Sequence, residues 1–134
     1  MRDSSPPRYL RVQVRYNGKL GLPVGIFGAC HHLRRAGRLS AEDDQRFTEI
    51  DAWFDRELVT PPFYHDGNSI KAITWFKRSA TRLLEALGPL REILERYEVP
   101  YDIVESDDPG TIVYEDEFQV GVVDAKFPPR AAGD

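Results

Sequence analysis

The sequence has little cysteine, no long apolar run and no excess of positive charge. Its single cysteine, Cys30, excludes an internal disulfide, so we expect a reducing, cytoplasmic environment. The apolar runs are too short to span a bilayer, and the N-terminal residues lack the apolar core of a signal peptide, so we expect no membrane partner. The net charge of −4 argues against broad nucleic-acid binding, which needs a basic surface.

Short motifs that would by themselves identify a reaction are also missing. No Gly-x-Ser-x-Gly, His-Glu-x-x-His or phosphate-loop pattern occurs. Cys30 and His31 are neighbours on a predicted helix, where side chains point about 100° apart, so they do not form a nucleophile–base pair. His31 and His32 fail as a chelating pair for the same reason. We therefore predict no metal and no cofactor.

Several glycines precede the first predicted helix, at positions 18, 21, 25 and 28. They match no nucleotide-binding fingerprint, and tight turning and close packing explain them. An anion bound at the start of that helix remains an open alternative, because a strand-to-helix turn exposes backbone N–H groups.

The length and composition are those of a single folded domain. The chain has 134 residues, of which 41% are apolar and 30% charged, which is ordinary for a globular protein. We predict one domain over residues 1–134, with an ordered core at about 9–124 and tails at 1–8 and 126–134.

Hydrophobic periodicity predicts an α+β fold. Alternation from Tyr9 to Tyr16 indicates a strand whose polar face carries Arg11 and Arg15, expected to pair across strands with Glu115 and Glu117. Helical periodicity indicates four helices: residues 26–36, a second capped by Ser40 and running to 58, a third from 68 or 69 to 87, and a fourth at 89–97. Residues 101–104 and 111–123 favour strands. The predicted sheet has three or four strands, an N-terminal strand plus a C-terminal hairpin, with four helices on one face.

The C-terminal region allows two interpretations. If residues 111–123 form one continuous strand, Asp116 shares a face with core residues. If the strand breaks into a hairpin at Glu115-Asp116, Asp116 lies in solvent. We favour the continuous strand, because this dipeptide lacks the Gly or Asn that a two-residue turn prefers.

Three charged residues fall on faces predicted to be buried: Asp51, Lys77 and Asp116. Because a buried unpaired charge is costly, we expect them to have partners, with Lys77 pairing with Asp51 or Asp116. A shared pocket completed by His65 or Tyr64 would indicate a functional site. One structural salt bridge, or exposure through helix curvature, is the competing explanation.

The segment 61–69, which contains Tyr64 and His65, is unusually aromatic for a loop and precedes Trp75 on the predicted third helix. It favours a ligand- or partner-binding module that uses this loop and the start of the following helix. The predicted binding residues are Tyr64, Trp75, Asp51, Arg34 and Arg35. The partner is expected to be a small molecule or a protein, including a second copy of this chain.

The alternative is a small cofactor-independent enzyme that performs general acid–base chemistry on a polar or anionic metabolite. His65 and Asp116 would then transfer the proton, and Lys77 would hold an anionic group.

Overall fold

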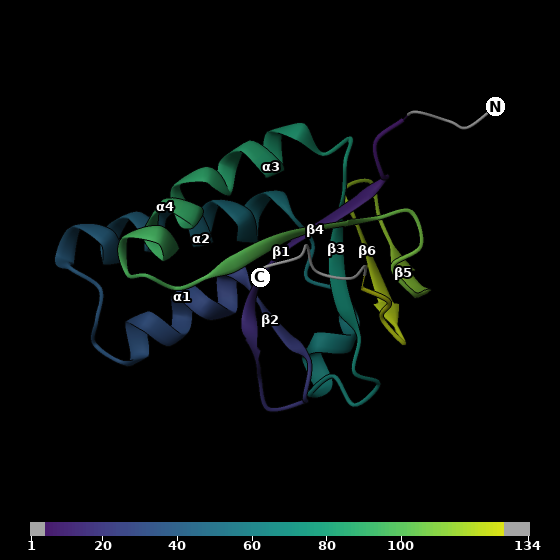
Figure 1. The fold of residues 1–134 in the computed structure, drawn as a ribbon, viewed down its shortest axis with the longest axis horizontal. Helices are drawn as coiled ribbons and strands as arrows, with labels where there is room; N and C mark the ends of the chain where they lie inside the picture. The colour runs from purple at the N-terminus through teal and green to yellow at the C-terminus, as the bar shows by residue number, and fades with distance from the viewer. Residues whose placement is uncertain (1–4, 128–134) are drawn as a thin grey trace.

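The computed structural model describes residues 5–127, which form a layer of helices packed on a curled sheet (Figure 1). The elements in chain order are β1 (Tyr9–Asn17), β2 (Pro23–Gly25), α1 (Ile26–Arg35), α2 (Ala41–Glu57), the 3-10 helix η1 (Pro62–Asp66), β3 (Ile73–Lys77), α3 (Thr81–Ala86), α4 (Gly88–Arg96), β4 (Tyr101–Ser106), β5 (Thr111–Glu115) and β6 (Gln119–Val123). Over this part of the chain, none of the helices has the length and apolarity that crossing a membrane requires.

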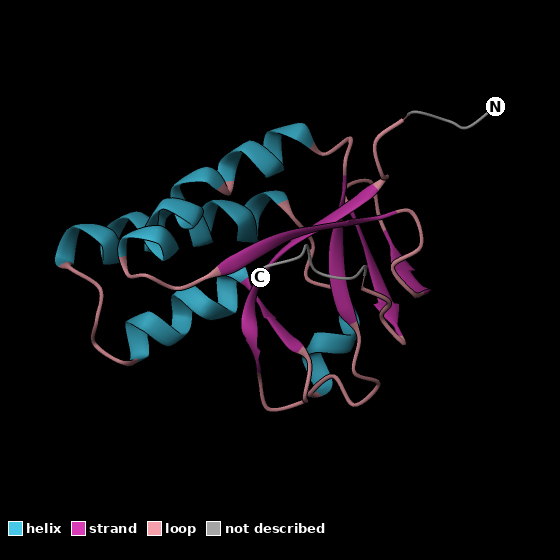
Figure 2. Cartoon of the chain, viewed as in Figure 1, coloured by secondary structure: helices cyan, strands magenta, loops and turns pink. Residues whose placement is uncertain are grey.

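The sheet has six strands in the order β2-β1-β3-β6-β5, with β4 on the other edge of β1 (Figure 2). All five pairings are antiparallel. β1 is the organising strand: β4 runs along one edge, while β2 and β3 share the other. β3 pairs with β1 only at Tyr9 and Leu10, and β2 pairs with it only from Gln13 onward.

The α+β class holds, but the predicted sheet of three or four strands with four helices is wrong. The sheet has six strands, and the described residues contain three α-helical units, because α3 and α4 follow one another with only Leu87 between them. Leu87 itself has helical backbone angles (φ −75°, ψ −17°). β2 is only three residues long and lies within the glycine-rich passage, so it carries no periodic signal.

The largest error concerns residues 68–87, which are not one helix. Asn68 and Lys71 have positive φ angles of 53° and 57°, which a helix does not accept. The Asn68 side chain both donates to the Ala72 carbonyl (2.7 Å) and accepts from its N–H (2.8 Å), and this turn leads into β3. In β3, Ile73 and Trp75 point to one face and Phe76 to the other. A short run of β-branched and aromatic residues is ambiguous between helix and strand.

Residues 111–123 form a hairpin of β5 and β6, not the continuous strand that we favoured. The turn between them is stabilised by Asp116, whose carboxylate accepts hydrogen bonds from the backbone N–H groups of Phe118 (2.9 Å) and Gln119 (3.1 Å). An Asx-type turn therefore replaces the missing glycine. The predicted C-terminal hairpin between 101–104 and 111–123 does not form, because β4 pairs with β1.

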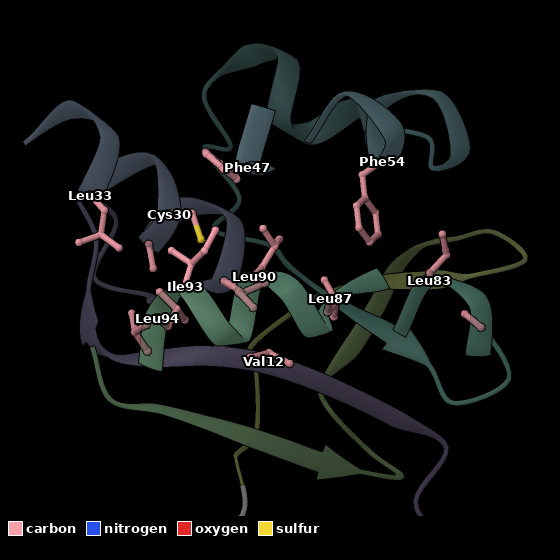
Figure 3. Close-up of a cluster of buried hydrophobic side chains, with 14 residues drawn as sticks. Val12, Cys30, Leu33, Phe47, Phe54, Leu83, Leu87, Leu90, Ile93 and Leu94 are labelled. Atoms are coloured by element: carbon pink, nitrogen blue, oxygen red, sulfur yellow. The ribbon is translucent and has the colours of Figure 1, made fainter. Parts of the chain in front are cut away.

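Apolar side chains cover both faces of the sheet. The main cluster joins α1, α2, α3 and α4 to Val12 and Val14 of β1, and Figure 3 shows residues from all of these helices converging. A smaller cluster on the opposite face contains Tyr9, Ile73, Trp75, Val120 and Val122. The second face is therefore not an open polar surface.

The predicted start of α2, with Ser40 as its cap, is confirmed. Ser40 Oγ accepts from the Asp43 N–H (3.1 Å), as expected for an N-cap. Asp43 does not complete the capping box, because its buried carboxylate accepts from the Tyr97 hydroxyl (2.7 Å) and from Arg96. The Tyr97 oxygen in turn accepts from the Ser40 N–H (2.9 Å). This network joins the start of α2 to the end of α4.

We expect Tyr97→Phe to lower the free energy of unfolding by about 2 kcal/mol at pH 7, since it removes a hydrogen bond to a charged carboxylate. Burial acts to raise the pKa of Asp43, but the bonds from Tyr97 and Arg96 outweigh it and hold the pKa below its ordinary value of 3.8. The carboxylate therefore contributes stability above pH 3.8, and this contribution is lost as the pH falls through the lower folded-state pKa.

The difference between wild type and Tyr97→Phe should accordingly shrink in urea titrations below that pH. Tyr101→Phe, which removes an exposed bond to Glu95, is the control and should cost less. A difference that stays constant down to pH 2 would contradict the role given to Asp43.

Candidate functional site

A cavity of about 430 Å³ lies between the start of α1, the second half of α2, the segment leading into η1, and β3. This volume falls within the range of small-molecule sites. Most of its wall is apolar, with Ile26 and Phe27 from α1, Phe54 and Leu58 from α2, and Phe76 from β3. A few polar groups interrupt this wall, and the chemistry of the site depends on them.

The cavity reaches the sheet where β2 and β3 separate along the edge of β1. Arg11 lies between the last pair with β3 (Leu10 with Phe76) and the first pair with β2 (Gln13 with Gly25). Its guanidinium bridges the gap. Nη1 donates to the Thr74 carbonyl (2.8 Å) on β3, Nη2 donates to the Pro23 carbonyl (2.9 Å) on β2, and Nε donates to Gln13 Oε1 (2.8 Å).

Arg11 is a buried cation without a counter-ion. Arg11 is only 9% exposed to solvent, and no carboxylate of the described residues pairs with its guanidinium. Burial lowers the pKa of the Arg11 guanidinium to about 10, which leaves it charged at neutral pH. Its three bonds use three of the five N–H donors of a guanidinium, and all three go to neutral acceptors. The expected pairing of Arg11 with Glu115 or Glu117 does not occur, and Arg15 bonds Asp102 instead.

The N-terminus of α1 borders the same cavity. Gly25 is its N-cap residue, and no side chain accepts a hydrogen bond from the first turn. Gly25, Ile26, Phe27 and Gly28 all line the cavity, so free backbone N–H groups and the positive end of the helix dipole lie beside it. A Cβ at Gly25 would lie 3.3 Å from Arg11 Nη2, so glycine lets the guanidinium pack closely against this turn.

Trp75 borders the cavity, but its ring lies on the other face of the sheet, in the cluster with Val120 and Val122, where it stacks on Phe127. The ring is fully buried, and its indole Nε1 makes no hydrogen bond to any described residue. The donors at the cavity are therefore Arg11 and the first turn of α1.

The opposite wall carries acids. Asp51 and Asp55, one helical turn apart on α2, both line the cavity. The Asp51 carboxylate lies 3.7 Å from His31 Nε2, while Asp55 is exposed and makes no ion pair or hydrogen bond with the described residues. The site is therefore charged on both sides.

The aromatic segment 61–69 closes one end of the cavity through Pro61 and Tyr64. This segment and the residues just before it are held against the sheet at two points. Gln119 donates to the Val59 carbonyl (2.7 Å), and the Phe63 ring packs where a Cβ at Gly121 would come within 2.6 Å of it. Glycine at position 121 thus makes room for η1.

Three of the predicted site residues border this cavity: Tyr64, Trp75 and Asp51. The geometry of Trp75 differs from the prediction, because it is a buried strand residue rather than an outward-facing helix residue. Arg34 lies outside the cavity, where it bonds Asp44 (2.7 Å) and packs over Phe47, and Arg35 is exposed at the end of α1.

His65, Lys77 and Asp116 do not line the cavity, and no hydrogen bond or ion pair joins any two of them in residues 5–127. Lys77 pairs with Glu115 (2.6 Å), not with Asp51 or Asp116. Burial acts to raise the pKa of Asp116, but hydrogen bonds from Gln119, Phe118 and Tyr114 outweigh it and hold the pKa below its ordinary value. Asp116 is thus occupied as a turn-forming acceptor.

Cys30 is fully buried, and burial raises the pKa of its thiol to about 12, so it remains protonated and unreactive at neutral pH. Within residues 5–127, no group of three His, Cys, Asp or Glu side chains is arranged to hold a metal ion.

Arg11 and Asp55 border the cavity but were not predicted as site residues. Alternation placed Arg11 on a face assumed to be solvated, and no pattern in β1 reveals that two other strands part beside it. The glycines near the start of α1 were the one signal for this region, through the anion site left open there. Comparison with protein-family models, with curated proteins and with solved structures finds no match to this chain.

Proposed function

We propose that this protein binds a small organic anion with an apolar body in the cavity between α1, α2 and β3. The observation that carries this proposal is Arg11, a buried guanidinium that borders the cavity and has no counter-ion among the described residues. A protein normally pairs such a charge, so an anionic ligand would supply the missing partner.

The other donors support a carboxylate as the anionic group. Arg11 retains two N–H donors, and the first turn of α1 presents backbone N–H groups on the same side. Guanidinium and carboxylate match in a two-point geometry, and a helix N-terminus adds favourable dipole interaction. The aromatic and aliphatic wall formed by Phe27, Phe54 and Phe76 would receive the apolar body.

No observation favours the catalytic alternative over binding. An acid–base mechanism needs a proton-transfer group at the bound ligand, and His65, Lys77 and Asp116 lie outside the cavity. The proposal keeps the binding role of the 61–69 segment, because Pro61 and Tyr64 form part of the wall.

A thermal-shift comparison of para-ethylbenzoate with the neutral para-ethylbenzamide tests the proposal. At about 0.5 kcal/mol per non-hydrogen atom, para-ethylbenzoate should bind with a Kd of about 0.1 mM. At about 5 mM ligand this stabilises the fold by about 2 kcal/mol and raises Tm by about 6 °C.

The amide has nearly the same shape but no charge, and we expect it to raise Tm by no more than about 1 °C. Equal shifts for the acid and the amide would show that charge is irrelevant to binding. No shift for either compound, or for longer and bulkier arylcarboxylates, would contradict the proposed function.

A further inference from the structure

The acids on α2 give the cavity a second charged end. Asp51 and Asp55 are four residues apart, so both side chains project from one face of the helix toward the cavity wall. Arg11 enters from the sheet layer, and the acids enter from the helix layer that covers it. The positive charge of Arg11 thus borders the cavity from the sheet, and the negative charges of Asp51 and Asp55 border it from the helix α2.

This negative end is not neutralised within the described residues. Asp55 has no cationic partner, and Asp51 has only the His31 ring at 3.7 Å. One observation in the same cavity indicates a ligand without reference to the acids: the buried Arg11 has no carboxylate partner among residues 5–127 and keeps two unused N–H donors.

We propose that the ligand is a zwitterion, in which a carboxylate meets Arg11 and the α1 N-terminus while a protonated amine meets Asp55 and Asp51. This inference rests on the proposed function and specifies its ligand class. Multiply charged anions such as nucleotides fit poorly, because their additional negative charge would face two carboxylates. A singly charged acid satisfies only one end of the cavity.

The test compares two ligands of nearly equal shape, para-aminomethylbenzoate and para-ethylbenzoate, which differ only in whether the far end carries an ammonium or a methyl group. We expect wild type to bind the amine about 10-fold more tightly. Asp55→Asn should weaken the amine about 10-fold and leave para-ethylbenzoate unchanged or slightly tighter, because a repulsive carboxylate is removed. The affinities are measured by NMR titration. A second pair of compounds, para-(2-aminoethyl)benzoate and para-propylbenzoate, places the ammonium or methyl group one carbon farther from the ring.

Glu49→Gln is the matched control, since Glu49 is an exposed acid on α2 outside the cavity and, in the part of the chain that the structure describes, bonds only Gln45. It should leave all four affinities unchanged. The zwitterion proposal is wrong if both alkylbenzoates bind wild type as tightly as their amines, or if Asp55→Asn leaves the affinities of the amines unchanged. Either result leaves the proposed anion site intact. If none of the four compounds binds wild type, the proposed function itself fails.

Discussion

Replacing Trp75 with alanine is expected to lower the free energy of unfolding by about 4 kcal/mol. Trp75 is fully buried at the centre of β3, between β1 and β6, and belongs to the apolar cluster on the second face of the sheet. Its ring stacks on Phe127, with centroids 5.7 Å apart. Removing the indole leaves a cavity that the surrounding strands cannot close.

The other tryptophan provides the control. Trp53 is half-buried on α2 and packs under Arg82, with the guanidinium 5.3 Å from the ring centroid. Trp53→Ala should cost about half as much. Urea denaturation followed by circular dichroism measures both variants. If Trp75→Ala costs less than Trp53→Ala, residues 73–77 are not the buried central strand described above.

Arg11→Met is expected to weaken binding of para-ethylbenzoate about 100-fold, since two charge-assisted hydrogen bonds contribute about 3 kcal/mol. The fold should survive, with a free energy of unfolding within about 1.5 kcal/mol of wild type. The bonds to Gln13, Thr74 and Pro23 are lost, but a buried charge without a counter-ion is removed at the same time. Affinity and stability should therefore respond very differently to this substitution.

Two further variants separate charge from geometry. Arg11→Lys keeps the positive charge but loses the paired N–H donors with which a guanidinium binds both oxygens of a carboxylate, so we expect an intermediate loss of affinity. Arg34→Met removes an arginine that pairs with Asp44 outside the cavity, and it should leave the affinity unchanged. If Arg11→Met binds para-ethylbenzoate as wild type does, while Arg34→Met does not, the anion site lies on the surface of α1.

Local signals predicted the elements that carry regular patterns. Alternation identified β1, and helical periodicity with the Ser40 cap identified α2. The apolar positions Ile26, Cys30 and Leu33 of α1 are buried as expected. In these segments the spacing of the apolar residues, the capping residue and the burial of the side chains all indicate the same element, so neighbouring residues alone predict it.

The remaining elements depend on contacts that are distant in sequence. β3 has the composition of either a helix or a strand, and it becomes a strand because β1 and β6 supply hydrogen-bond partners on both sides. β5 and β6 are separated by a turn that depends on the Asp116 side chain rather than on a glycine.

The candidate site also depends in part on contacts between residues that are distant in sequence. Tyr64, Trp75 and Asp51 were singled out because aromatic or charged residues stood in unexpected places, and these three border the cavity. Arg11 gave no such signal, since an arginine on one face of an alternating strand is ordinary. Its burial follows from Pro23 and Thr74, which lie 12 and 63 residues away in sequence.

The most direct test of the anion site is an NMR titration of wild type with para-ethylbenzoate, followed at the two indole N–H signals. Trp75 borders the cavity, whereas Trp53 lies outside it, so the chain contains its own reference signal. We predict that the Trp75 signal shifts in a saturable manner, together with the backbone amides of Gly25, Phe27 and Gly28, while the Trp53 signal stays in place. Saturable shifts at Trp53 or in the His31-to-Arg38 region, with Trp75 unchanged, would contradict the binding site proposed for this protein.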